Sequence, residues 1–573
     1  MFEQSVSSND INLYDFELLQ EEKKNLQKKF RRKYHIFQTN IFQILTLFPQ
    51  VLLKWDIALI TLLSTLVRNC VAVGGFTGES TIIGSDNHHK SWINFTSSFS
   101  LKKWALSNTN TEYSRPIIFG YHSLLMSYLG NYLFDGRHKS WFTLKALKLE
   151  ENLEFRSFLK FTVCLTDALM YIPPAIWFAK MYGRLVAEKV NAATKNTSKT
   201  TFEIAAVGHL KQLVNFINSL IILFQPTVLL IDHAFFGYHG FTLGALLLSI
   251  NNIFDNKLGG ACVFYILAIF FDQNCIVFAP VFIVYFLKMT IFSFSLLDFA
   301  SIVFAVFMAL SLLYFPMYIY LDSQETLNLL KTSLLKLCPL TFTNTENDST
   351  NFWIYIKALF INKSISNEDL KLLSRVVKVV SILPTCIYMF KSCSISKKSK
   401  SKIILLYGLA SCSLSFYLFS YDFDCTSIVL PMLPLTLIIV KCNQIIDSKE
   451  KGNSFKVENN NYSLHMLFFI QNMSMYTIWP LISEYDLFPQ YAIIIFLYNW
   501  MFGGLDIFSA SHIQLYIKLF YMLLYSIMAL TIILSESIVL STEFQDKMNI
   551  FMFLLSHSSF FVSWLWLQYK MIM

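Results

Sequence analysis

The chain has 573 residues, of which 54% are hydrophobic and only 15% are charged, and its mean hydropathy is +0.48. A soluble protein of this size would carry about 25% charged residues, so these values exclude an ordinary soluble domain. The net charge of +8 is uneven, because seven Lys and Arg lie between Lys23 and Lys33 and five Lys between Lys391 and Lys402. Such clusters are typical of cytoplasmic membrane flanks, and we expect no nucleic-acid partner.

Long apolar runs recur from residue 57 to the end of the chain. Lipid forbids unpaired backbone, so spanning segments must be helices or a closed barrel, and these runs are too continuous for a barrel. At roughly 20 apolar residues per span, the sequence predicts an all-α polytopic membrane protein with about 11 to 14 transmembrane helices. The candidate spans are 55–73, 116–134, 161–182, 207–231, 241–254, 258–271, 274–288, 290–320, 373–390, 403–420, 425–441, 463–480, 490–503, 513–535 and 548–569.

Residues 1–50 are polar and basic, with no evident cleavable signal, and we expect them to form a cytoplasmic segment. Residues 51–573 are expected to form one transmembrane unit. It includes a long first luminal loop at 74–115 and a polar loop at 442–462. The first loop contains the glycosylation sequon Asn94-Phe95-Thr96.

The loop at 183–204 is basic and therefore looks cytoplasmic, whereas simple alternation of spans from the N-terminus would place it on the far side. One of the two preceding apolar runs is therefore expected not to cross the membrane fully. The candidate is 116–134, because it begins with Pro116.

The ten Cys lie singly, mostly within apolar runs, without CxxC or Cys/His metal spacing. We expect them to be small buried side chains. The sequence thus predicts no metal site and no cofactor.

Three polar places interrupt the apolar pattern. In LLIDHAFFGYHGFTLG, residues 229–244, the Asp232-His233 pair could hold a metal, move protons or bind a sugar, or could be a polar turn at the interface. In GSDNHHKSW, residues 84–92, Asp86 could act as a general base or belong to a solvated loop. Asp272-Gln273 is either a third such place or a short connecting turn.

These places coincide with an ordered series of family motifs. The series also includes LVRNCVAVGGFTG at 66–78, PIIFGYHSLL at 116–125 and FLKFTVCLTDALMYIPP at 158–174. Together they resemble the endoplasmic reticulum glucosyltransferases that use dolichyl-phosphate glucose to build the Asn-linked oligosaccharide. The likeness is greatest to the member that adds the first glucose to the dolichol-linked nine-mannose glycan. The resemblance implies a GT-C fold and a multi-pass protein of the endoplasmic reticulum membrane.

The resemblance implies an inverting α-1,3 glucosyl transfer from dolichyl-phosphate glucose to the dolichol-linked high-mannose oligosaccharide. One carboxylate would suffice as base, because phosphate is already a good leaving group. Asp86 is the expected base, and Arg68 could attract the donor phosphate or simply snorkel to the interface. Trp92, Trp104 and Tyr121 could stack on sugar or lipid or anchor the aromatic belt. The other expected substrate-binding residues are His122, Asp232, His233 and Gln273, of which Asp232 and His233 would shape the site.

The chain departs from the family pattern at the acidic positions. The family's first-loop acid falls on Ser85, one residue before Asp86, and the acid of its LDYPP motif falls on Ser114. In the DHGHFQYN motif, the family's His, Gln and Asn become Phe235, Gly237 and His239. An active enzyme, a family member with lost or changed chemistry, and a membrane scaffold therefore remain alternatives. A lipid or solute transporter is a further alternative, although no internal repeat supports it.

Overall fold

The structure is a computed structural model, and it describes most of the chain after residue 152 together with parts of the first 150 residues. The described residues are 34–35, 40–45, 55–74, 93, 96–98, 116–134, 153–193, 201–336, 353, 367–394, 396, 398–421, 425–442, 446–447, 453–484, 487–508, 513–537 and 542–572.

The described chain is almost entirely helical, which confirms the predicted all-α class. Its only sheet is an antiparallel pair of two-residue strands, β1 (Tyr34–His35) and β2 (Ile446–Asp447). The helices up to the middle of the chain are α2 (Asn40–Leu45), α4 (Asp56–Gly74), α7 (Ile117–Leu133), α8 (Leu153–Met170), α9 (Ile172–Ala193), α10 (Thr201–Leu223), α11 (Pro226–His233), α12 (His239–Phe254), α13 (Leu258–Phe271), η3 (Gln273–Phe278), α14 (Ala279–Met289), η4 (Ile291–Ser293), α15 (Leu296–Tyr320) and α16 (Ser323–Lys336). The later ones are α18 (Asn367–Ser392), α19 (Lys398–Phe419), η6 (Cys425–Ile428), α20 (Val429–Cys442), α21 (Asn453–Thr477), α22 (Trp479–Glu484), α23 (Phe488–Phe502), α24 (Leu515–Ser537) and α25 (Thr542–Ile572).

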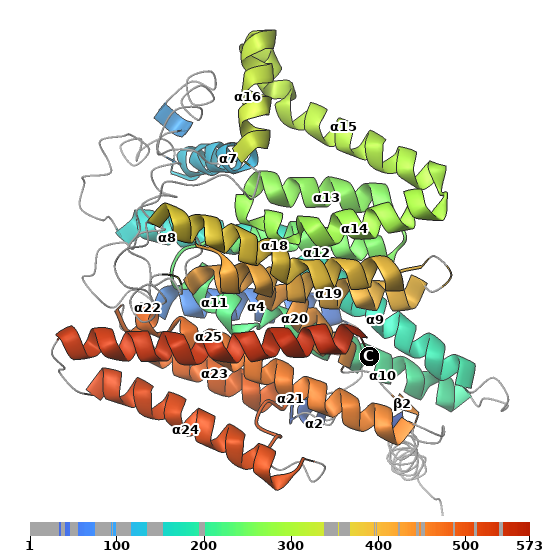
Figure 1. Ribbon diagram of the computed structural model, residues 1–573, viewed down its shortest axis with the longest axis vertical. Helices are drawn as coiled ribbons and strands as arrows, with labels where there is room; N and C mark the ends of the chain where they lie inside the picture. The colour runs from blue at the N-terminus through green and yellow to red at the C-terminus, as the bar shows by residue number, and fades with distance from the viewer. Residues whose placement is uncertain are drawn as a thin grey trace, which may run out of the picture.

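Most of the long helices run side by side in one bundle, as Figure 1 shows for α13, α18, α19, α24 and α25. Among the described residues, eight helical segments are long and apolar enough to span a bilayer. A ninth is reached if the bent pair Lys211–Leu223 and Pro226–His233 counts as one span. The sequence prediction of about 11 to 14 spans also counted shorter runs, which fold as helices of 14 to 16 residues in α12, α13 and α23.

The core lies around α19 and α20, whose side chains are almost all buried. By contrast, α15 presents large apolar side chains such as Phe304, Phe307 and Leu312 at the surface. In water this exposure would be costly, whereas lipid tails are as apolar as these side chains. The pattern therefore fits a helix that faces lipid.

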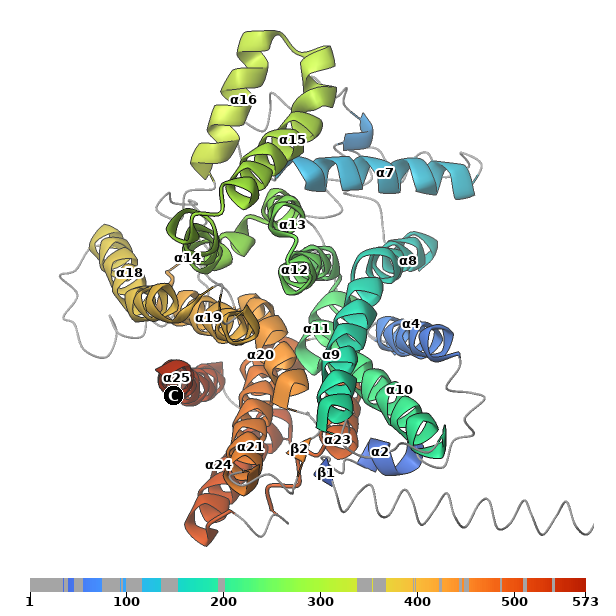
Figure 2. The same ribbon diagram turned by 90° about the vertical axis from the view of Figure 1, so that its right-hand side faces the viewer.

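Helix α7 lies across the bundle rather than along it. Figure 2 looks along the bundle, so that α12 and α13 appear end-on while α7 is seen along its length. With 17 residues, α7 is also absent from the candidate spans among the described segments. The expectation that 116–134 does not cross the membrane fully stays a prediction, which the direction of α7 favours.

A basic cluster lies at one end of the bundle. At the end of α12, Lys402 Nζ donates a hydrogen bond of 2.7 Å to Phe254 O, which places the Lys-rich start of α19 beside the C-terminus of α12. Helix α12 has 16 residues and is therefore about 24 Å long at 1.5 Å per residue. The first residue of α12, His239, consequently lies toward the opposite end of the bundle from this basic cluster.

Candidate functional site

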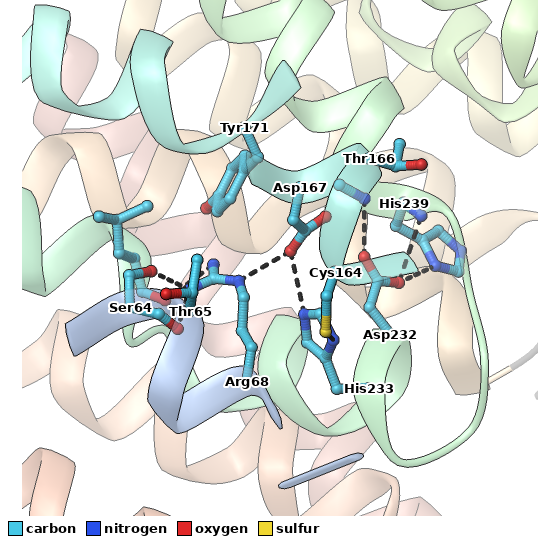
Figure 3. A network of polar contacts seen from close by, with 12 residues as sticks. Ser64, Thr65, Arg68, Cys164, Thr166, Asp167, Tyr171, Asp232, His233 and His239 are labelled. Carbon is cyan, nitrogen blue, oxygen red and sulfur yellow. Dashed lines mark hydrogen bonds and ion pairs between the residues drawn. The ribbon is translucent and has the colours of Figure 1, made fainter. Parts of the chain in front are cut away.

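A polar network joins α4, α8, α11 and α12 (Figure 3). Its geometry begins with a bend of 48° between α10 and α11. Pro226 occupies the first turn of α11. Proline has no backbone N–H, but the N–H groups of the first turn have no acceptor within the helix, so no hydrogen bond is lost there. The side chain of Gln225 caps the same turn by accepting from Val228 N at 2.6 Å. This local sequence starts a new short helix that ends at His233.

Arg68 on α4 and Asp167 on α8 form a fully buried ion pair, with Arg68 Nε 2.8 Å from Asp167 Oδ2. The guanidinium also donates to Leu223 O at 3.1 Å and to the hydroxyl of Ser64. The Tyr171 ring lies 5.6 Å from its Cζ. Since Asp167 lies on α8 and Leu223 at the end of α10, Arg68 connects α4 to both of these helices.

The sequence left two alternatives for Arg68, a contact with the donor phosphate and snorkelling to the membrane interface. The snorkelling reading is wrong, because the Arg68 side chain is 0% exposed. A contact with the donor phosphate stays a prediction, although Arg68 would have to give up Asp167, Leu223 or Ser64 to make it. Charged groups buried in a low dielectric are expensive to leave unpaired. The structure therefore favours Arg68 as a connector of helices.

His233 is the second partner of Asp167, with Nε2 3.0 Å from the same Oδ2 atom that receives Arg68. On its other edge, His233 Nδ1 lies 3.8 Å from the sulfur of Cys164. Cys164 also contacts Asn69 Oδ1 at 3.2 Å. His233 is thus held inside the protein by α8, and its expected role in shaping the site stays a prediction.

Asp232, the neighbour of His233, points the other way and organises the start of α12. Its Oδ1 lies 2.7 Å from His239 Nδ1 and 3.2 Å from His239 N, and its Oδ2 accepts from Gly240 N at 2.6 Å. An acidic side chain at a helix N-terminus is stabilised by the unpaired N–H groups and the helix dipole. Asp232 therefore fixes both the helix start and the orientation of the His239 ring.

Glycine is required at two places beside these carboxylates. A Cβ on Gly237 would lie 2.6 Å from Asp232 Oδ1 and 2.8 Å from His239 Nδ1, and one on Gly240 would lie 1.6 Å from Asp167 Oδ1. Gly240 thus separates the two carboxylates with backbone alone. The turn before α12 also contains Phe236 in the left-handed conformation, at φ 59°.

His122 on α7 lies at the edge of this network. Its Nε2 is 3.0 Å from Thr166 Oγ1, and its ring packs against Tyr238 and Phe271 with centroids 4.6 and 5.5 Å away. Burial lowers the pKa of His122 to about 4, because the charged form is poorly solvated there. Nδ1 has no hydrogen-bond partner within the described part of the chain. The structure thus places His122 beside Thr166 and Tyr238, the chain neighbours of Asp167 and His239, and its role in substrate binding stays a prediction.

Tyr121 and Gln273 are the two other predicted binding residues that the structure describes. Tyr121 donates to Leu313 O at 3.2 Å, which joins α7 to α15. Gln273 begins η3, directly after Asp272, whose side chain accepts from Asn274 N at 3.0 Å. The hydrogen bonds around Asp272 fit the connecting-turn alternative, and substrate contacts of Tyr121 and Gln273 stay predictions.

Asp86, Trp92 and Trp104 lie outside the described residues, as does the sequon residue Asn94. The described residue Ile93 is buried in the same hydrophobic cluster as Phe236 and Tyr238. This cluster also contains residues of α7, α8 and α13. Ile93 therefore shares a cluster with the turn that leads into His239.

Metal binding at Asp232-His233 gains no support. Within the described ranges, no group of three or more His, Cys, Asp and Glu side chains could hold a metal ion. The carboxylates of Asp167 and Asp232 instead contact nitrogen atoms of the protein.

Two members of the network were not selected from the sequence. Asp167 is a carboxylate inside the apolar run 161–182. An ionisable residue within a span is costly in lipid, and this cost alone marks Asp167 as a candidate. His239 opens the apolar run after Asp232-His233 and departs from a family motif, but the sequence assigns it no role. Its closeness to Asp232 depends on the turn at 234–238, which the sequence pattern does not specify.

Comparison with known proteins supplies the family. The chain is 26% identical to "Dolichyl pyrophosphate Man9GlcNAc2 alpha-1,3-glucosyltransferase" of Saccharomyces cerevisiae, over 77% of this chain and 73% of the relative. It is 26% identical to "Probable dolichyl pyrophosphate Man9GlcNAc2 alpha-1,3-glucosyltransferase" of Schizosaccharomyces pombe, over 87% and 88%. The relative from Gallus gallus is 26% identical over 67% and 70%. A model of the ALG6, ALG8 glycosyltransferase family matches residues 85–569, so the chain belongs to this family, and the predicted family and GT-C fold class are confirmed.

Proposed function

We propose that this protein transfers glucose from dolichyl-phosphate glucose to the dolichol-linked high-mannose oligosaccharide, forming an α-1,3 linkage with inversion. The observation that carries the proposal is the family match over residues 85–569. The names of the relatives support the finer assignment of acceptor and linkage. The membrane-spanning helices suit a reaction whose donor and acceptor are both anchored by lipid.

The polar network supports a site at the end of the bundle where α12 begins. Helices α4, α8 and α11 are joined there by buried charges, and α7 lies across the bundle. Ile93 is buried in the same cluster as Phe236 and Tyr238 of the turn before α12. The resemblance implies that Trp92, Trp104 and His122 bind substrate. The resemblance implies Asp86 as base.

The charge distribution supports an orientation in the endoplasmic reticulum membrane. Cytoplasmic flanks carry an excess of Lys and Arg, and Lys398, Lys400 and Lys402 lie at the end of the bundle opposite His239. We therefore place that basic end and residues 1–50 in the cytoplasm. The network end then faces the lumen.

Complementation tests the proposal. The chain would be expressed in cells that lack the first-glucose transferase, and their dolichol-linked glycans would be sized. We expect the nine-mannose glycan to gain one glucose. A correctly inserted, well-expressed protein that leaves this glycan unchanged would favour the degenerate-enzyme or scaffold alternative. The transporter alternative is not supported, because the family match is to glycosyltransferases.

A further inference from the structure

Helix α16 leaves part of its apolar surface exposed. Leu327 and Leu334 are large apolar side chains, yet they are 65% and 46% exposed. They are seven residues apart, almost two helical turns, so they project from the same side of the helix. Single exposed leucines are ordinary on a protein surface, whereas two at this spacing form a stripe. The apolar stripe of Leu327 and Leu334 therefore calls for a partner.

The other sides of α16 complete an amphipathic pattern. Leu329 comes two residues after Leu327, about 200° around the helix, and it is buried. It belongs to the same hydrophobic cluster as Tyr238. Gln324 and Asn328 are exposed polar side chains on a third side of the helix. The helix thus has an apolar side against the protein, an apolar stripe that faces outward and a polar side.

Helix α16 lies across the bundle rather than along it. Figure 2, which looks along the bundle, shows α16 along its length, as it does α7. Contacts within the chain hold the turn that leads from α15 into α16. Leu321 is buried and its N–H donates to Met317 O at 2.9 Å, while Thr326 Oγ1 donates to Asp322 O at 3.1 Å. Since the bundle crosses the membrane, α16 is held roughly parallel to the membrane surface.

Helix α7, at the same end of the bundle, has a similar exposed stripe. Its Phe119 belongs to the cluster that contains Leu329 of α16. Helix α7 contains no charged residue, and the exposed side chains of Leu125, Tyr128 and Tyr132 recur at helical spacing. Two helices that lie across this end of the bundle therefore both present apolar side chains outward.

Membrane lipid is the partner that fits the stripe on α16. The stripe continues the lipid-facing surface of α15, whose last residues, Ile319 and Tyr320, are exposed directly before the turn. Tyrosine is enriched at the boundary between lipid and water. Lys331 follows Leu327 by four residues and precedes Leu334 by three, so it lies beside the stripe, and it is exposed. A lysine placed in this way lays its apolar stem on the acyl chains and extends its charge to a lipid phosphate.

We propose that α16 is an interfacial helix, whose Leu327 and Leu334 enter the acyl chains of the lipid leaflet at the end of the bundle where α12 begins. Its polar side faces the headgroups and water. Leu329, on the opposite side, packs in one cluster with Phe236 and Tyr238 of the turn before α12. The depth of α16 in the leaflet therefore sets how far this turn lies from the lipid phosphates.

Photo-crosslinking to lipid tests the inference, with the purified full-length protein in nanodiscs of phosphatidylcholine. The photoreactive residue p-benzoylphenylalanine replaces Leu327 or Leu334, and the mass of the intact protein is measured after irradiation. We expect both positions to gain the mass of one phospholipid. Leu312, on the lipid-facing side of α15, is the positive control and should show the same gain. Asn328, exposed on the polar side of α16, is the matched control and should show little of it.

Thiol labelling gives a second measurement with smaller substitutions. In the same nanodiscs, Leu327→Cys should react with a hydrophilic maleimide at least about tenfold more slowly than Asn328→Cys, because an apolar environment disfavours the reactive thiolate. Mass spectrometry of the labelled peptides separates each introduced Cys from the native ones. Both changes are at exposed positions, so we expect the fold to tolerate them.

Other partners of the stripe give different results. Crosslinks from Leu327 and Leu334 to the same chain would show that a segment of this protein covers the stripe, and crosslinks between chains would show that a second copy does. Either result would overturn the inference, as would a missing lipid adduct where Leu312 forms one. Equal labelling rates of Leu327→Cys and Asn328→Cys would show that the stripe faces water. None of these measurements uses glucosyl transfer, so their outcome is independent of the proposed function.

Discussion

Arg68 Nε and Asp167 Oδ2 lie 2.8 Å apart, although 99 positions separate the two residues in the chain, and both side chains are buried. The pair connects α4 to α8, two helices between which α7 lies in the chain. Asp167 holds His233 with the same oxygen, at 3.0 Å. This relationship makes Asp167 the centre of the network.

Removing the charge of Asp167 should destabilise the protein strongly. In Asp167→Asn, the buried guanidinium of Arg68 loses its counter-ion, and breaking a buried ion pair costs about 3–5 kcal/mol. We expect a clear fall in the thermal unfolding temperature of the purified protein in detergent. Lys180 and Asp56 give the control, because they are 3.5 Å apart and 28% and 15% exposed, and Asp56→Asn should change the temperature little. An equal effect of the two changes would contradict the central place of Asp167.

A methyl group at Gly244 should separate α8 from α12. A Cβ there would lie 2.0 Å from Met170 O, a backbone atom that cannot rotate away. Overpacking of this kind typically costs about 1–3 kcal/mol, so Gly244→Ala should lower the unfolding temperature and the yield of folded protein. Gly260→Ala is the matched change, because the nearest atom to its Cβ would be the side-chain oxygen of Asn252, at 2.8 Å. A larger loss for Gly260→Ala would argue against the close contact of α8 and α12.

Acidification should lower the free energy of unfolding through His122 on α7. Burial lowers the pKa of His122 from 6.5 to about 4, so the unfolded state binds more protons than the folded state between these values. The contribution of neutral His122 is therefore complete above pH 6.5 and is lost as the pH falls toward 4, up to about 3 kcal/mol.

Unfolding temperatures between pH 7 and pH 4 measure this loss. His122→Gln removes the titrating group, so its unfolding temperature should fall less steeply with pH than that of the wild type. Identical slopes for the two proteins would show that His122 is not buried as the structure has it.

The fold class followed from the sequence because apolar run length alone requires helices in lipid. The charge of loop 183–204 likewise led to the expectation that 116–134 does not cross, and α7 lies across the bundle. The site was predicted only in part. Asp232 and His233 were identified as ionisable groups at membrane depth, but Asp167 was not, because nothing in its local pattern names a partner 99 residues away.

The contact between Asp232 and His239 could not be predicted from the sequence either. Its formation depends on a five-residue turn in which Phe236 adopts the left-handed conformation and Gly237 leaves room for the ring. A left-handed Phe is unusual, and sequence rules would assign such a position to Gly or Asn. The tertiary packing of Phe236 and Tyr238 into the cluster with Ile93 holds the turn instead.

The most direct test of the central claim is transfer by the purified chain itself. Membrane-extracted protein would be mixed with the dolichol-linked nine-mannose glycan and either dolichyl-phosphate glucose or dolichyl-phosphate mannose, and the released glycans would be sized. The account predicts one added hexose, removable by an α-glucosidase, with the glucose donor only. An unchanged glycan with both donors, or transfer from the mannose donor, would contradict it.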